Sequence, residues 1–249
     1  MASDPHRSGT DAAGDASGTG RTPVRLHVPV ERVVRVLWWT VVAAIVATFA
    51  AQVWHKLAGD ENTIIELFDS DQKLNFPTAL KLALMAGAAL LFCLVALGAS
   101  ARRDRVRWFG LGALFGLVTL DELTYMHQRI SDAFHEWFGS SGILRFSWIV
   151  IYVPVLAVIA IAYFPWWRAL PRQLRNGLLW AAILFAGGSA GVELAKGALY
   201  EEHDWGLKFG LVAAFSDSLE FIGLALLVAM LLREVASAPG AVTLGFERD

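Results

Sequence analysis

Residues whose side chains can bind cations or exchange protons follow directly after an uncharged, apolar run in the middle of the chain. They are Asp121, Glu122, Thr124, His127 and Gln128. At about 100° per residue, the first, third and fifth of these share one face of a helix, and His127 borders that face. A carboxylate and an imidazole placed together can hold a cation or exchange a proton. This segment therefore predicts one wall of a polar site.

Glu122 points about 100° away from Asp121 on the same helix. We therefore expect Glu122 to pair with another helix or with Arg129. The alternative interpretation is that a membrane span ends near Leu120, in which case the acids begin an exposed amphipathic extension.

A second polar set lies in a later apolar segment, at spacings of four, three and four residues; it consists of Ser189, Glu193, Lys196 and Tyr200. These spacings place the set on one helix face. Glu193 and Lys196 are one turn apart and can form an ion pair. The set either contributes to a polar site or is a neutralised pair that holds two helices together.

The third set, Ser216, Asp217 and Glu220, lies inside the last apolar segment. Asp217 and Glu220 share a face, and no basic residue follows in this segment before Arg233. An ionisable side chain inside a membrane costs roughly 2.5–3.5 kcal/mol. Two carboxylates at this depth need a cation, a shared proton or a partner on another helix. This set is the strongest functional signal in the sequence.

The elements that position these residues are six stretches long and apolar enough to cross a bilayer, which takes about 20 helical residues. They lie at about 34–55, 78–99, 106–127, 147–167, 176–200 and 208–232. The runs LALMAGAALLFCLVALGA of the second span and WIVIYVPVLAVIAIAYFPWW of the fourth contain no charge. The predicted fold is an all-α bundle of six transmembrane helices.

Charges in the connecting segments predict the orientation. Arginines gather before the first span, after the second, after the fourth and after the sixth, whereas the opposite loops are acidic. Basic residues favour the cytoplasmic side, so both termini are expected there. The acids then lie late in two outward spans and early in one inward span. We therefore expect one polar cavity that is open to the extracytoplasmic side.

The first outer loop, roughly 56–77, contains Asp69, Asp71 and Asn75. It can cap this cavity, but a solvated acidic turn is the favoured interpretation.

The chemistry of the combined set allows several functions. Asp121, His127, Glu193 and either Asp217 or Glu220 can bind Zn, Mn or Fe. A metal there can activate water, as in a metal-dependent membrane hydrolase that acts on a lipid or small substrate. The same residues can instead bind a cation or small polar ligand, which is the leading hypothesis. The third possibility is a structural or partner-binding membrane subunit.

Composition excludes other classes. The chain has 249 residues, of which 56% are hydrophobic and 18% charged, whereas soluble domains carry about 25% charged residues. A net charge of −2 argues against nucleic-acid binding, and the single cysteine, Cys93, excludes an internal disulfide. We expect a disordered cytoplasmic tail at 1–30, a transmembrane domain at 31–234 and a second cytoplasmic tail at 235–249.

Three motifs resemble those of a group of uncharacterised multi-pass bacterial inner-membrane proteins. They are Leu120-Asp121-Glu122 with His127, the glycine-rich stretch from Gly187 to Glu193, and the stretch from Leu219 to Ala225. The resemblance covers about the last 130 residues and implies a shared fold and polar centre but no reaction. Gln128 stands where that group often has an acid after the histidine, and Ser216 or Ser218 stands where it has a second acid. These departures remove candidate metal ligands and favour a hydrogen-bonded or proton-sharing cluster.

Overall fold

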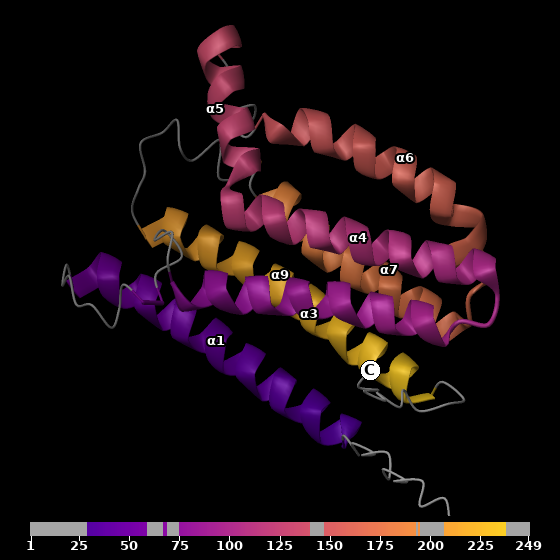
Figure 1. Ribbon diagram of the computed structural model, residues 1–249. Coiled ribbons are helices and arrows are strands. Elements are labelled where there is room, and N and C mark those ends of the chain that lie inside the picture. Colours follow the sequence, from indigo (N-terminus) through magenta and orange to yellow (C-terminus); the bar gives the residue numbers. More distant parts are fainter. Residues whose placement is uncertain are drawn as a thin grey trace, which may run out of the picture. The chain divides into compact units, whose positions relative to one another are not determined.

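The computed structural model describes residues 29–58, 67–68, 75–139, 147–192, 194 and 207–237. Within these residues the chain forms seven α-helices and one π-helical segment, η2 (Figure 1). Their bounds are α1 Val30–Ala58, α3 Phe76–Gly98, α4 Arg102–Thr124, α5 Met126–Phe138, α6 Trp148–Ala169, α7 Arg172–Ala186, η2 Gly187–Val192 and α9 Leu207–Ser237. The predicted all-α class is confirmed.

Four helices in the described part of the chain are long and apolar enough to cross a membrane, namely α1, α3, α6 and α9. The pair α4 and α5 makes a fifth if its two halves form one span, which is bent by 63°. The predicted count of six is not confirmed. The remaining predicted span, 176–200, begins in α7, changes to the π-helical η2 and then runs largely outside the described residues.

Helix α9 is the element against which most others pack. It contacts α1, α3, α7 and η2, and α3 also packs along α4 (Figure 1). Phe221 and Leu224 of α9 and Phe92 and Met85 of α3 are almost fully buried in this core. A glycine allows α4 to approach α3 closely, because a Cβ on Gly112 would lie 3.1 Å from the Ala89 carbonyl oxygen of α3.

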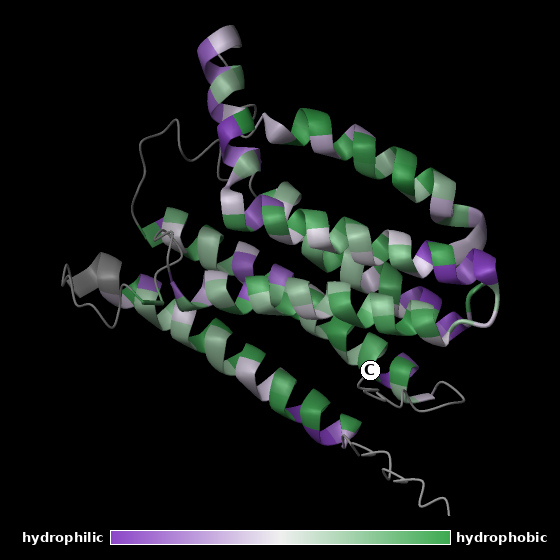
Figure 2. Cartoon of the chain, in the orientation of Figure 1, coloured by the Kyte–Doolittle hydropathy of each residue, from purple (hydrophilic) through white to green (hydrophobic). Residues whose placement is uncertain are grey.

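Hydrophobic residues predominate along the long helices (Figure 2), and many of the large ones are exposed. On α6, Val158 is 66% exposed and Ile161 is 74% exposed. The most apolar stretch of this helix contains no buried residue. Such a surface is unfavourable in water, because apolar area costs roughly 25 cal/mol per Å² when it is exposed. Lipid chains remove this cost. The apolar helices therefore place the protein in a lipid bilayer.

Polar contacts fix helix ends, both within one helix and between two helices. Asn75 begins α3, and its Oδ1 accepts a hydrogen bond of 2.6 Å from the Thr78 backbone N–H. At the far end of α9, the guanidinium of Arg233 donates to both carboxylate oxygens of Glu31 on α1, at 2.8 and 3.0 Å. Asn75 thus caps a helix, whereas Asp69 and Asp71 lie outside the described residues.

Candidate functional site

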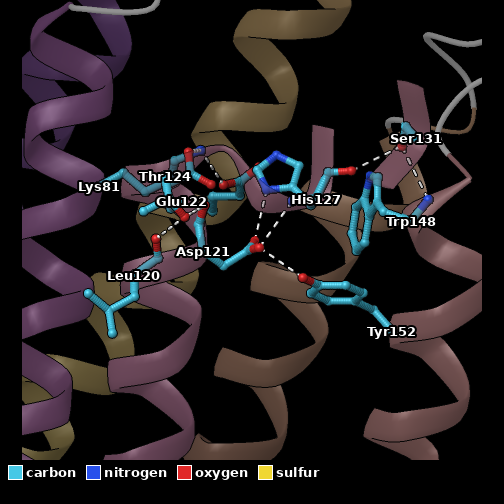
Figure 3. A network of polar contacts seen from close by, with 10 residues as sticks. Lys81, Leu120, Asp121, Glu122, Thr124, His127, Ser131, Trp148 and Tyr152 are labelled. Carbon is cyan, nitrogen blue, oxygen red and sulfur yellow. Dashed lines mark hydrogen bonds and ion pairs between the residues drawn. The ribbon is translucent and has the colours of Figure 1, made fainter. Parts of the chain in front are cut away.

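A lysine joins two glutamates from different helices. The Lys81 Nζ on α3 lies 2.7 Å from the Glu122 Oε1 on α4 and 3.1 Å from the Glu220 Oε2 on α9 (Figure 3 shows Lys81 and Glu122). The exposed fractions of these side chains are 15% for Lys81, 19% for Glu122 and 6% for Glu220. We call these three residues the lysine cluster. Glu122 therefore pairs with another helix, which is one of the two alternatives that its position predicted.

The local sequence explains why Lys81 reaches this position. Asn75 caps the start of α3 and Pro77 occupies its first turn, where a missing N–H is tolerated. Lys81 is then little more than one turn into the helix, before the uncharged run begins. This start places the ammonium at the same level as the end of α4 and the early part of α9.

Helix α9 supplies two further polar groups near the lysine cluster. Asp217 is partly buried and lies one turn before Glu220 on the same face of α9. Ser216 is buried, and its hydroxyl donates a 2.8 Å hydrogen bond to the Gly188 carbonyl oxygen of η2. The π-helical segment therefore lies directly beside the carboxylates of α9.

Glycine is required at that contact. A Cβ on Gly188 would lie 2.7 Å from the Ser216 carbonyl oxygen and 2.8 Å from the Glu220 Cγ. The neighbouring Gly187 and Gly191 do not make this approach, since a Cβ on either would meet nothing within 4 Å. The π-helical turn thus brings the glycine between them against α9.

A second network surrounds Asp121. Its Oδ2 lies 2.8 Å from the His127 Nδ1, and its Oδ1 accepts a 2.8 Å hydrogen bond from the Tyr152 hydroxyl of α6 (Figure 3). The backbone N–H of His127 also donates to Oδ1, at 3.1 Å. The side chains of His127 and Asp121 are 14% and 15% exposed. We call Asp121, His127 and Tyr152 the histidine cluster.

The break between α4 and α5 makes the histidine cluster possible. Residues six apart in an unbroken helix point about 120° away from one another. Tyr125 instead adopts a left-handed conformation with φ of 54°, and α5 turns by 63° from α4. Left-handed backbone is unfavourable for a residue with a side chain, so this turn is a strained feature beside the cluster.

Contacts from α5 and α6 hold the imidazole. The Ser131 hydroxyl donates to the His127 carbonyl oxygen at 3.2 Å and accepts from the Trp148 backbone N–H at 3.2 Å. The Trp148 ring also lies edge-on to the His127 ring, with centroids 5.8 Å apart. These contacts fix both the backbone and the ring plane of His127.

Two predicted supporting residues lie outside both clusters. The prediction of one continuous helix face through Asp121, Thr124 and Gln128 is wrong, because α4 ends at Thr124 and Gln128 lies on α5. The Thr124 side chain is exposed and donates to the Leu120 carbonyl oxygen at 2.7 Å. Gln128 is exposed on α5. Helix α5 thus resembles the amphipathic extension of the alternative interpretation.

The predicted set in the fifth span is described only in part. Ser189 is partly buried in η2, whereas Glu193, Lys196 and Tyr200 lie outside the described residues. Their predicted spacing assumed an α-helix, whereas residues 187–192 form a π-helix.

Two residues of the clusters were missed in the sequence. Lys81 lies within the predicted second span, but immediately before the uncharged run by which that span was judged. Its position near the predicted outer end of that span matched the predicted level of the acids and was the available signal. Tyr152 lies in the uncharged fourth span, where a phenolic hydroxyl needs a hydrogen-bond partner.

The predicted metal-ligand set is divided between the two clusters. Asp121 and His127 lie in one, and Glu220 pairs with Lys81 in the other. Among the described residues, no group of three or more His, Cys, Asp or Glu side chains could hold a metal ion. Glu193 falls outside those residues.

Long apolar helices with ionisable clusters between them define a multi-pass α-helical membrane protein. The chain belongs to the family described as Domain of unknown function (DUF8692), whose model matches residues 36–234. No curated protein and no solved structure matches the chain.

Proposed function

We propose that this protein binds a small cation at the carboxylates of the lysine cluster and Asp217, within the outer half of a bacterial inner membrane. In this proposal the chain crosses the membrane six times and has both termini in the cytoplasm. The distribution of arginines between alternate connecting segments supports that orientation.

The charge balance of the lysine cluster carries the proposal. One ammonium group, on Lys81, faces the carboxylates of Glu122 and Glu220, and Asp217 adds a third acid nearby. Carboxylates therefore outnumber cationic groups at this site among the described residues. Excess charge in a membrane interior is unfavourable, so the site favours uptake of a proton or a cation.

Access and donor type favour a metal cation over a proton alone. Glu122 and Lys81 retain 19% and 15% exposure, so an ion can reach the carboxylates without unfolding the bundle. The available donors are carboxylate oxygens, which suit hard cations such as Na⁺, Mg²⁺ and Ca²⁺. In the described arrangement these carboxylates form no group that could hold a metal ion, so binding requires Lys81 to move away and the carboxylate oxygens to come together around the ion.

A cation panel tests the proposal. Detergent-purified protein is heated with chlorides of Na⁺, Mg²⁺, Ca²⁺, Mn²⁺ or Zn²⁺, and Tm is recorded for wild type, Glu220→Gln and Asp217→Asn. Ligand binding to the native state raises Tm, so one cation should stabilise wild type and lose its effect in both variants. Glu234→Gln, an exposed carboxylate on the same helix, is the matched control. If every cation shifts wild type and Glu220→Gln equally, the proposal is wrong.

The histidine cluster favours a second candidate, a hydrolase. Asp121 holds the Nδ1 of His127, and no hydrogen bond joins its Nε2 to a described residue. A histidine oriented in this way can accept a proton from water at Nε2. Hydrolysis of a p-nitrophenyl ester that is lost in His127→Gln but kept in Glu220→Gln would favour this candidate. If both variants lose bundle stability and neither a cation effect nor hydrolysis is found, the remaining interpretation is a structural membrane subunit.

A further inference from the structure

A basic hollow lies at the start of α4, at the end of the helix opposite to the clusters. It has a volume of about 450 Å³ and is lined by Arg102, Arg103, Val106 and Arg107. Figure 2 shows hydrophilic residues gathered at this end of α4. Arg102, Arg103 and Val106 are exposed, and Arg107 is partly buried. The hollow therefore offers three guanidinium groups and one apolar side chain.

Charge in the hollow is only partly neutralised. Asp104 lies 3.9 Å from Arg107 and also accepts a 3.0 Å hydrogen bond from the Trp166 indole N–H. Arg102 and Arg103 form no ion pair with any described residue. A net positive field thus remains in the open part of the hollow.

One side of the hollow is held in place by aromatic residues. The Arg107 guanidinium lies over the Trp166 ring, 5.9 Å from its centroid. Trp166 packs edge-on against Trp108, with centroids 4.8 Å apart, and Tyr163 donates to the Arg107 carbonyl oxygen at 3.3 Å. Tryptophan and tyrosine favour the membrane–water interface, which is the level of lipid phosphates.

We propose that this hollow binds the headgroup of an anionic phospholipid such as phosphatidylglycerol. One guanidinium group can donate two parallel hydrogen bonds to phosphate oxygens. The backbone amides at the start of α4 add a weaker attraction for an anion. Val106, which is 62% exposed, contacts the glycerol and the first acyl carbons. A zwitterionic lipid binds less well, because its ammonium group enters the same positive field.

Lipid titration followed by native mass spectrometry tests this proposal. The fraction of detergent-purified protein that carries phosphatidylglycerol or phosphatidylcholine is measured for wild type and for the double variant Arg102→Gln/Arg103→Gln. Each basic residue near an anionic lipid contributes about 1 kcal/mol, so the variant should bind phosphatidylglycerol about tenfold to thirtyfold more weakly. Binding of phosphatidylcholine should be weak in wild type and unchanged in the variant.

A charge-matched control separates the hollow from general basic character. Arg32→Gln/Arg35→Gln removes the same charge from exposed positions of α1, on the side that the sequence predicts to be shared with the hollow. This control should bind phosphatidylglycerol as wild type does. An equal loss in both double variants, or equal binding of both lipids by wild type, would overturn the proposal. If the first double variant does not fold, Arg102→Gln and Arg103→Gln are compared singly with Arg32→Gln under the same criteria.

Discussion

Asp121 and Glu122 are neighbours on α4, yet their carboxylates belong to different networks. Asp121 accepts from His127 and Tyr152, whereas Glu122 pairs with Lys81 on α3 (Figure 3). Successive residues on a helix point about 100° apart, so one turn of α4 serves two sites on different sides. The single polar cavity expected from the sequence is instead two clusters that share one helix.

Removal of the lysine should strongly destabilise the bundle. Lys81→Met leaves Glu122 and Glu220 without their cationic partner, and breaking a buried ion pair costs about 3–5 kcal/mol. Thermal unfolding in detergent measures the loss, and Arg129→Met, at an exposed position of α5, should change stability by less than about 0.5 kcal/mol. The double variant Lys81→Met/Glu220→Gln should recover part of the stability. An unchanged Tm in Lys81→Met would show that the ion pairs do not hold the helices.

The histidine cluster should behave as one coupled unit. Asp121→Asn removes the charge that orients His127 and should cost about 1.5–3 kcal/mol, whereas Tyr152→Phe should cost about 0.5–1.5 kcal/mol. The double variant should lose less than the sum, because both single changes weaken the same hydrogen bond. Unfolding free energies of the four proteins test this coupling, and strict additivity would contradict it.

Substitutions at two adjacent glycines of η2 should differ in their effect on stability. Gly188→Ala places a Cβ against backbone atoms of α9 that cannot move aside, and overpacking of this kind costs about 1–3 kcal/mol. Gly187→Ala, with open space around its Cβ, should be neutral or slightly stabilising. The Tm values of the two variants compare these contacts directly. Equal effects would mean that η2 does not pack closely on α9.

Cysteine labelling tests the proposed orientation. In a Cys93→Ser background, Ala101→Cys lies between α3 and α4 and Asp132→Cys lies on α5, and both positions are exposed. Two cytoplasmic termini predict that an impermeant maleimide labels position 132 but not position 101 in cells with a permeabilised outer membrane. Both positions should react after lysis. Labelling of position 101 but not of position 132 before lysis would mean that the orientation is the reverse of the proposed one.

Much of the fold is readable from the sequence, because long apolar helices are specified by composition and length alone. The stretches that became α1, α3, α6 and α9 were all predicted as spans. The break at Tyr125 was not predicted, since no glycine or proline marks it and its left-handed backbone depends on tertiary contacts. The π-helical turn at Gly187–Val192 was missed for a similar reason, because its hydrogen-bond pattern has no fixed sequence signature.

The sequence indicated which ionisable residues belong to the candidate site, but not which residues pair with one another. Asp121, His127 and Glu220 stood out because ionisable groups are rare in apolar segments. Their partners Lys81 and Tyr152 come from helices distant in sequence, and helix periodicity carries no information about which helices pack together. Lys81 lies just before an uncharged run, so its position in the sequence did not indicate that it pairs with Glu220 of α9.

Isothermal titration of the detergent-purified protein tests the central claim most directly. The cation that gives the largest Tm increase is titrated into wild type, Glu220→Gln and Glu234→Gln, each shown by circular dichroism and gel filtration to be folded. The account predicts saturable binding near one ion per chain in wild type and Glu234→Gln, and at least about tenfold weaker binding in Glu220→Gln, which loses a charged ligand. Saturable binding that is identical in wild type and Glu220→Gln, or no binding by folded wild type, would contradict a cation site at these carboxylates.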